Sequence, residues 1–178
     1  SQNEHSKSII KTLKQNLGGL KKVSKDRQLQ ELKKIISVKN FSKINSDKII
    51  SELFLLIFPE LKNIKRIKKL NDLEENIINS KNLEFILSLL LIDGSDDCDY
   101  FIYKYNLSNK EKNKINLLNS IFSEEPQKDY FTKQSLLKIL YKNGKENLID
   151  ILDFRILTSK KDKNNLIELK KYFKEFQI

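Results

Sequence analysis

Residues 82–93 read NLEFILSLLLID and form the most apolar segment of the chain. Apolar side chains fall on nearly every side of a helix drawn through this segment, and a helix of that kind is normally surrounded by protein. Its apolar run, Ile86–Ile92, is far shorter than the ~20 residues that a membrane-spanning helix needs. We therefore expect a helix at the centre of a protein core, ended by Gly94, and no association with a membrane.

The apolar residues before and after this segment also recur at helical spacing. The chain has only 4 Gly and 2 Pro in 178 residues, and this scarcity of helix breakers favours helices over a turn-rich β fold. A weaker helical pattern covers 73–78, and Pro126 marks a loop. With no convincing strand and no fixed-period repeat, the sequence predicts an all-α protein: a compact orthogonal array of about ten to twelve short helices.

Capping residues predict where several helices begin. Ser24 and Thr132 each precede a stretch with helical apolar spacing, as N-cap residues do. Ser108 and Glu111 have the spacing of a capping box, in which each side chain satisfies the other's backbone amide. In residues 61–70 apolar side chains recur at every third position, which predicts a short basic helix.

The chain is strongly basic, with 34 Lys and Arg against 24 Asp and Glu and a formal net charge of +10. Such an excess favours a polyanionic partner, above all nucleic acid. Codon bias is the competing explanation, because the chain has no Ala, is rich in Lys, Ile and Asn, and has Arg only at Arg27, Arg66 and Arg155. Charge alone leaves both explanations open.

No catalytic or metal-binding set is apparent in the sequence. Cys98 and His5 are the only residues of their types, which excludes an internal disulfide and a four-ligand zinc site and fits a cytoplasmic location. Residues 93–99, DGSDDCD, have the acidic content of a calcium loop. However, Cys98 stands where that loop needs Gly, and Lys104 stands where it needs Glu. We therefore expect helix punctuation there.

The stretch LKKVSKDRQLQELKKII, residues 20–36, resembles the neck motif of class II bacterial tRNA nucleotidyltransferases (CCA-adding enzymes) and poly(A) polymerases. It departs from the family pattern at Asp26, where Glu is usual, and at Gln28, where an apolar residue is usual. Positions that keep the family residue are Ser24, Arg27, Glu31, Leu32 and Lys34. Later stretches are similar to family motifs in the same order: IFPEL at 57–61, LLLID at 89–93, LSNKE at 107–111 and LYKNG at 140–144.

The resemblance implies that residues 1–45 are a neck-like segment and residues 46–178 a helical, RNA-binding body. The family's catalytic head would precede Ser1 and its tail would follow Ile178. Mg²⁺ and ATP or CTP would belong to that head, so this chain alone would be inactive. Ser24, Arg27 and Glu31 would support the nucleotide pocket of the head. The resemblance does not separate CCA addition from addition of A residues.

The resemblance further implies that the body offers a basic surface to RNA, in particular to the acceptor arm of tRNA. The candidate contacts lie in three lysine-rich stretches: Lys62, Lys65, Arg66, Lys69, Lys104, Lys110, Lys112, Lys114, Lys142 and Lys145. The alternative is a helical protein-interaction scaffold without a nucleic-acid role. Basic side chains gathered on one face would favour RNA, whereas interleaved charges would favour the scaffold.

Overall fold

The computed structural model describes residues 4–38, 41–72, 81–123, 130–159 and 162–176. These residues form α-helices and 3-10 helices and contain no strand, so the predicted all-α fold is confirmed. In chain order the elements are α1 (Glu4–Asn16), η1 (Leu17–Lys22), α2 (Lys25–Ile36), η2 (Phe41–Ser46), α3 (Lys48–Ile57), η3 (Ile64–Asp72), α5 (Leu83–Leu91), α6 (Asp97–Lys104), α7 (Asn109–Ser123), α8 (Lys133–Asn143), α9 (Lys145–Thr158) and α10 (Lys163–Glu175), where η marks a 3-10 helix.

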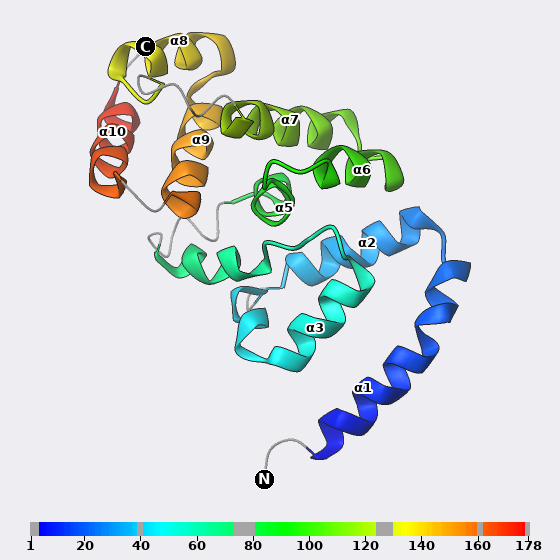
Figure 1. Ribbon diagram of the computed structural model, residues 1–178. Helices are drawn as coiled ribbons and strands as arrows, with labels where there is room; N and C mark the ends of the chain where they lie inside the picture. The colour runs from blue at the N-terminus through cyan, green and yellow to red at the C-terminus, as the bar shows by residue number, and fades with distance from the viewer. Residues whose placement is uncertain (1–3, 39–40, 73–80, 124–129, 160–161, 177–178) are drawn as a thin grey trace.

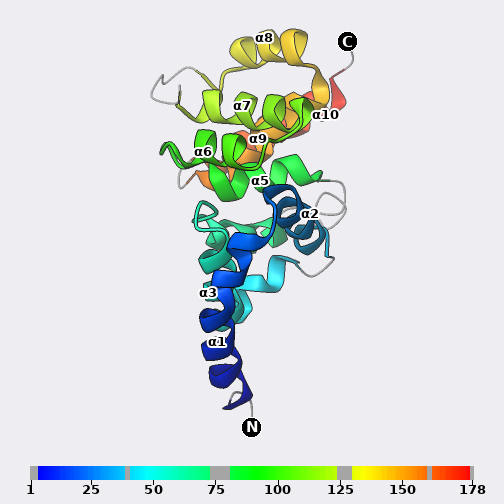
Figure 2. The same ribbon diagram turned by 90° about the vertical axis from the view of Figure 1, so that its right-hand side faces the viewer.

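Helix α5 lies at the centre of the array, as its composition predicts. Phe85, Leu87 and the run Leu89–Leu91 have no exposed surface. Elements α2, α6, α7, α9 and η3 all pack against α5, and both ribbon views place it between η3 and α7 (Figure 1, Figure 2). Burying a side chain of this size contributes roughly 1.5–3 kcal/mol, so this helix holds the layers together.

The predicted basic helix at 61–70 is a 3-10 helix, η3. A 3-10 helix has three residues per turn, so positions three apart lie on the same side. The apolar positions Leu61, Ile64, Ile67 and Leu70 are accordingly all buried. The positions between them form two further strips, one exposed at Lys62, Lys65 and Lys68 and one half-buried at Asn63, Arg66 and Lys69.

The predicted caps are confirmed. The Ser24 hydroxyl accepts a hydrogen bond from the Arg27 amide, and the Thr132 hydroxyl accepts one from the Ser135 amide. Ser108 and Glu111 form the capping box: the Glu111 carboxylate accepts from the Ser108 amide at 2.9 Å, and the Ser108 hydroxyl accepts from the Glu111 amide at 3.4 Å.

The expected boundary near residue 45 falls inside η2, where the Asn45 side chain donates to the Ile64 carbonyl at 2.6 Å. The division into neck and body stays a prediction. The weak helix expected at 73–78 and the loop at Pro126 lie outside the described residues. Within the described ranges, no helix combines the length and apolarity needed to cross a membrane.

Candidate nucleic-acid interface

The three candidate pocket-support residues of the neck motif lie at the solvent-exposed start and side of α2. Ser24 is the N-cap, and Arg27 and Glu31 are exposed one turn apart. Glu31 pairs with Lys34 at 2.9 Å. The hydrogen bond and charge of Lys34 lower the pKa of Glu31, and the charge of Arg27 adds a smaller effect in the same direction. The side chains of Ser24, Arg27 and Glu31 do not belong to the core.

Gln28, which departs from the family pattern, is buried and ties η1 to α2. Its side-chain amide donates to the carbonyls of Leu20 at 2.8 Å and Val23 at 2.9 Å. Its oxygen accepts from Lys25 at 3.1 Å. An apolar residue at this position could make none of these bonds. This role could not be predicted from the sequence, because the partner carbonyls belong to a turn whose shape the sequence does not specify.

The basic candidates of η3 and the preceding loop have unequal environments. Arg66 donates to the carbonyls of Leu89 at 3.3 Å and of Ile92, at the end of α5. Lys69 donates to the Leu157 carbonyl at 2.9 Å, in the last turn of α9. These bonds satisfy carbonyls that have no partner within their own helix. Burial lowers the pKa of the Arg66 guanidinium, and the charge of Asp93 opposes this effect.

Lys62 and Lys65 are the more accessible pair in this stretch. Lys62 pairs with Asp97 at the start of α6, and its pKa is raised by the hydrogen bond and charge of that partner. Lys65 is exposed and has no ion-pair partner among the described residues. Arg66 and Lys69 are thus bound to the fold, while Lys62 and Lys65 reach solvent.

The four lysines of residues 104–114 come together around α7, which has a hollow on each side. We call the first hollow the Tyr103 groove; it lies between α6 and α7 and includes Lys104 and Lys112 in its lining. We call the second the asparagine cavity; it lies between α7 and the starts of α5 and α9 and is lined in part by Lys110 and Lys114. Asn116 lines both hollows.

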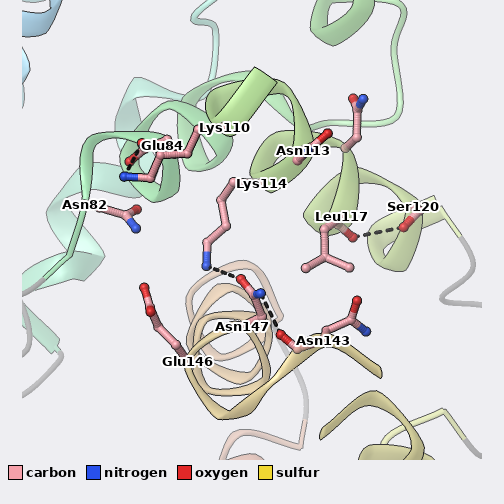
Figure 3. Close-up of a pocket in the computed structure, with 11 residues that line it drawn as sticks. Asn82, Glu84, Lys110, Asn113, Lys114, Leu117, Ser120, Asn143, Glu146 and Asn147 are labelled. Atoms are coloured by element: carbon pink, nitrogen blue, oxygen red, sulfur yellow. Dashed lines mark hydrogen bonds and ion pairs between the residues drawn. The ribbon is translucent and has the colours of Figure 1, made fainter. Parts of the chain in front are cut away.

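The asparagine cavity has a volume of about 670 Å³ and a polar lining. Figure 3 shows Lys114 extending across it towards α9, where its ammonium donates to the Asn147 side chain at 2.7 Å. Lys110 pairs with Glu84 across its rim at 3.3 Å. Together with Glu146, the charged residues of the lining are two lysines and two glutamates. Its amides come from Asn82, Asn113, Asn116, Asn143 and Asn147.

A buried cluster of charges lies behind the asparagine cavity and fixes Lys114. Asp150 pairs with Lys114 and, at 2.5 Å, with Lys81. Asp153 pairs with Lys81 at 2.8 Å and with Lys170 at 2.5 Å. Asp153 is fully buried, and each of its two carboxylate oxygens faces a lysine ammonium. Lys114 is therefore a structural residue as well as a lining residue.

The remaining candidates also divide into lysines that are bound within the fold and lysines that have no such partner among the described residues. Lys104 pairs with Glu60 at 2.6 Å. Lys145 donates to the Phe176 carbonyl at 2.8 Å, at the end of α10. Lys112 is half-buried and Lys142 is exposed, and neither has an ion-pair partner in the described part of the chain. Of the candidates, Lys62, Lys65, Lys110 and Lys142 are exposed, and Lys112 is half-buried without an ion-pair partner among the described residues.

The basic residues do not gather on a single face. η3 and α7 lie on opposite sides of α5 (Figure 1, Figure 2), so the candidates of residues 62–69 are separated from the group around α7. Within the α7 group, carboxylates of Glu60, Glu84 and Asp150 alternate with the lysines. The described candidates therefore form a local cluster of lysines with hollows beside it, and they do not form an extended basic plane.

The Tyr103 groove is a feature that the sequence did not reveal. Tyr103 is 85% exposed, whereas Cys98, Phe101 and Tyr105 on the opposite side of α6 are buried. The spacing of these three apolar positions is the signal that could have placed Tyr103 in solvent. The nearby Lys112 and Asn116 come from the next helix, so the groove itself depends on tertiary packing.

No cluster of three or more His, Cys, Asp and Glu among the described residues could hold a metal ion. No family model, no curated protein and no solved structure matches the chain.

Proposed function

We propose that this chain is an RNA-binding helical region, corresponding to the neck and body of a template-independent RNA nucleotidyltransferase. The parent enzyme would add CCA to tRNA 3′ ends or A residues to RNA. The neck-like stretch at 20–36 and the later motifs support the family assignment. The observation that carries RNA binding is the convergence of Lys104, Lys110, Lys112 and Lys114 on two hollows beside α7.

RNA would be held mainly through phosphates and shape. Lysine ammoniums act as point charges, and they lack the paired donors with which arginine recognises a base edge. Lys110 and Lys112 are the side chains of this group that can reach a phosphate. Lys104 and Lys114 are held by Glu60 and Asp150 and maintain the walls of the hollows. Such contacts position RNA without reading its sequence.

In this proposal the catalytic chemistry belongs to a head domain of the parent protein. Mg²⁺ and ATP or CTP would bind to that head, and the exposed Arg27 and Glu31 on α2 would support it. This chain alone is then expected to incorporate no nucleotide into tRNA. The binding partners would be the acceptor arm of tRNA and the enzyme's own head.

A protein-interaction scaffold is the second candidate. It is favoured by the carboxylates that alternate with the lysines around α7 and by exposed apolar side chains. Ile50 and Leu56 on α3 are 51% and 46% exposed, and Ile9 and Leu13 on α1 are similarly accessible. Among the described residues, helix α1 packs mainly against η1 and α3, and in Figure 1 it extends away from the array. These helices could receive a protein partner, including the head domain.

A matched pair of charge variants separates the two functions. The double variant K110Q/K112Q removes two cations from the α7 group, and K43Q/K48Q removes two exposed cations from η2 and α3. Fluorescence anisotropy with a tRNA acceptor-arm hairpin would compare their affinities. The proposal predicts a clearly weaker K110Q/K112Q and a nearly unchanged control. Equal affinities of the two variants would remove the α7 group from RNA binding.

A further inference from the structure

The wall of the Tyr103 groove is formed by one side of α6 and by the turn that ends it. Asp99, Ile102 and Tyr103 follow the i, i+3, i+4 spacing that brings side chains onto one helix face, and Asn106 joins the lining from the turn. The turn is closed by two hydrogen bonds, from the Asn106 amide to the Tyr103 carbonyl at 3.2 Å and from the Leu107 amide to the Ile102 carbonyl at 3.3 Å.

This pair of bonds defines a Schellman motif, whose C′ residue adopts the left-handed conformation. Asn106 occupies that position with φ of 46°, and asparagine tolerates it better than most residues. The capping box of Ser108 and Glu111 then starts α7 directly. The turn is therefore fixed at both ends, and the distance between Tyr103 on α6 and Lys112 on α7 is set by the fold.

The groove combines an apolar floor with a polar rim. Ile102 is packed against the core, and the ring of Tyr103 stands beside it in solvent. The rim carries the amides of Asn106 and Asn116 and the ammonium of Lys112. Lys104 is held by Glu60 and stays at the groove's edge. The volume is about 600 Å³, which lies within the range of small-molecule sites, roughly 300–1,000 Å³.

We infer that the Tyr103 groove seats one unpaired nucleobase of a single-stranded RNA segment. This inference rests on the proposed RNA-binding function and names the part of the RNA that the groove takes. The Tyr103 ring stacks on the base, because every nucleobase offers an aromatic face. The amides of Asn106 and Asn116 hydrogen-bond its edge, and Lys112 contacts the adjoining phosphate.

The composition of the groove fits a base better than a phosphate. The carboxylate of Asp99 would repel an anion placed beside it in the groove, and Ile102 offers an anion no hydrogen bond. A base, in contrast, has an apolar face for the floor and polar atoms at its edge for the rim. The phosphate then remains at the outer side, where Lys112 has no competing carboxylate partner among the described residues.

The test uses an acceptor-arm hairpin with a short single-stranded 3′ tail, in a normal form and in forms carrying an abasic position in the tail. Base–aromatic stacking predicts that Tyr103→Ala weakens binding of the normal hairpin about fivefold to a hundredfold. Tyr103→Phe retains the ring and should bind like the original protein. Tyr141→Ala is the matched control, because Tyr141 is 71% exposed on α8 and lines neither hollow.

The hairpin whose abasic position removes the seated base should bind the original protein weakly. Its affinity should equal that of the normal hairpin for Tyr103→Ala. Combining the abasic hairpin with Tyr103→Ala should cause no further loss. Normal affinity of Tyr103→Ala, or equal losses for Tyr103→Ala and Tyr141→Ala, would overturn the base-seat inference while leaving RNA binding in place. Absence of binding by the original protein to every hairpin would overturn both the inference and the proposed function.

Discussion

Glu111 connects the start of α7 to α2, and its replacement gives a sharp test of the packing. Only 5% of Glu111 is exposed. One carboxylate oxygen lies 2.5 Å from the Lys33 ammonium. The other accepts hydrogen bonds from the Ser108 amide at 2.9 Å and the Ser108 hydroxyl at 2.7 Å. The two oxygens therefore have different partners, and all of these partners are donors.

Glu111→Gln keeps the shape of the side chain and removes one of its two acceptor oxygens. The new NH₂ group must face either the Lys33 ammonium or the Ser108 amide. Both of these are donors, so the hydrogen bond at that position is lost. A hydrogen bond to a charged group contributes roughly 1.5–3 kcal/mol, so the free energy of unfolding should fall by about 2 kcal/mol. For a chain of this size, each kcal/mol changes the melting temperature by about 2–4 °C. We expect a decrease of about 4–8 °C in thermal unfolding followed by circular dichroism.

The pH dependence gives this prediction a second readout. Burial alone would raise the pKa of Glu111, but the hydrogen bonds from Lys33 and Ser108 outweigh burial and leave that pKa below its usual value. Because the folded pKa is the lower one, the stabilisation is complete above the unfolded pKa and disappears as pH falls through the folded pKa. The difference between the original protein and Glu111→Gln should be full at pH 7 and should shrink below about pH 4.5.

Glu31→Gln is the matched control, since Glu31 forms an exposed pair with Lys34 and exposed pairs contribute little. Its melting temperature should remain that of the original protein. The reasoning would be refuted if Glu111→Gln melted at the original temperature at pH 7. It would also be refuted if the difference stayed constant down to pH 3.

Three further predictions concern other buried or half-buried groups. Asp150→Asn weakens the ion pairs that Asp150 forms with Lys81 and Lys114. Because loss of one partner of a buried pair costs roughly 3–5 kcal/mol, urea unfolding should show a larger loss of unfolding free energy than for Glu111→Gln. Arg66→Gln should lower the melting temperature because Arg66 satisfies carbonyls at the end of α5, whereas the exposed Lys65→Gln should leave it unchanged; equal losses would contradict this distinction. Burial, with the charges of Asp99 and Asp93, raises the pKa of Cys98 to about 12. Its thiol should therefore react with a disulfide reagent at pH 8 only after denaturant is added. Rapid labelling of the folded protein would count against the packing of α6.

Local signals made much of the fold predictable. The central position of α5 follows from a segment apolar on all sides, and the starts of α2, α7 and α8 follow from capping side chains that bond within three residues. The spacing by three in 61–70 matches the period of η3. Each of these features is determined by residues close together in the sequence, so a single sequence contains the information.

The partners of the lysines could not be predicted, because they lie far away in the sequence. Lys69 bonds to a carbonyl 88 residues later, and Lys114 bonds to Asn147 on another helix. In the sequence, Lys65 and Lys69 look equivalent, yet one is exposed and the other is bound to the fold. The Tyr103 groove depends in the same way on how α7 packs beside α6, so composition alone could indicate a basic chain but not its binding surface.

RNA binding across a salt series is the most direct test of the proposed function. Fluorescence anisotropy would measure the affinity of this chain for a tRNA acceptor-arm hairpin between 50 and 200 mM salt. Each phosphate contact contributes a log–log slope of roughly −0.7 on single strands, so the two contacts of Lys110 and Lys112 would weaken binding about sevenfold over this range, and four contacts roughly fiftyfold. We predict micromolar or weaker binding with this salt dependence. Binding that does not change with salt, or no binding at 50 mM salt and high protein concentration, would contradict the account and favour the protein-interaction scaffold.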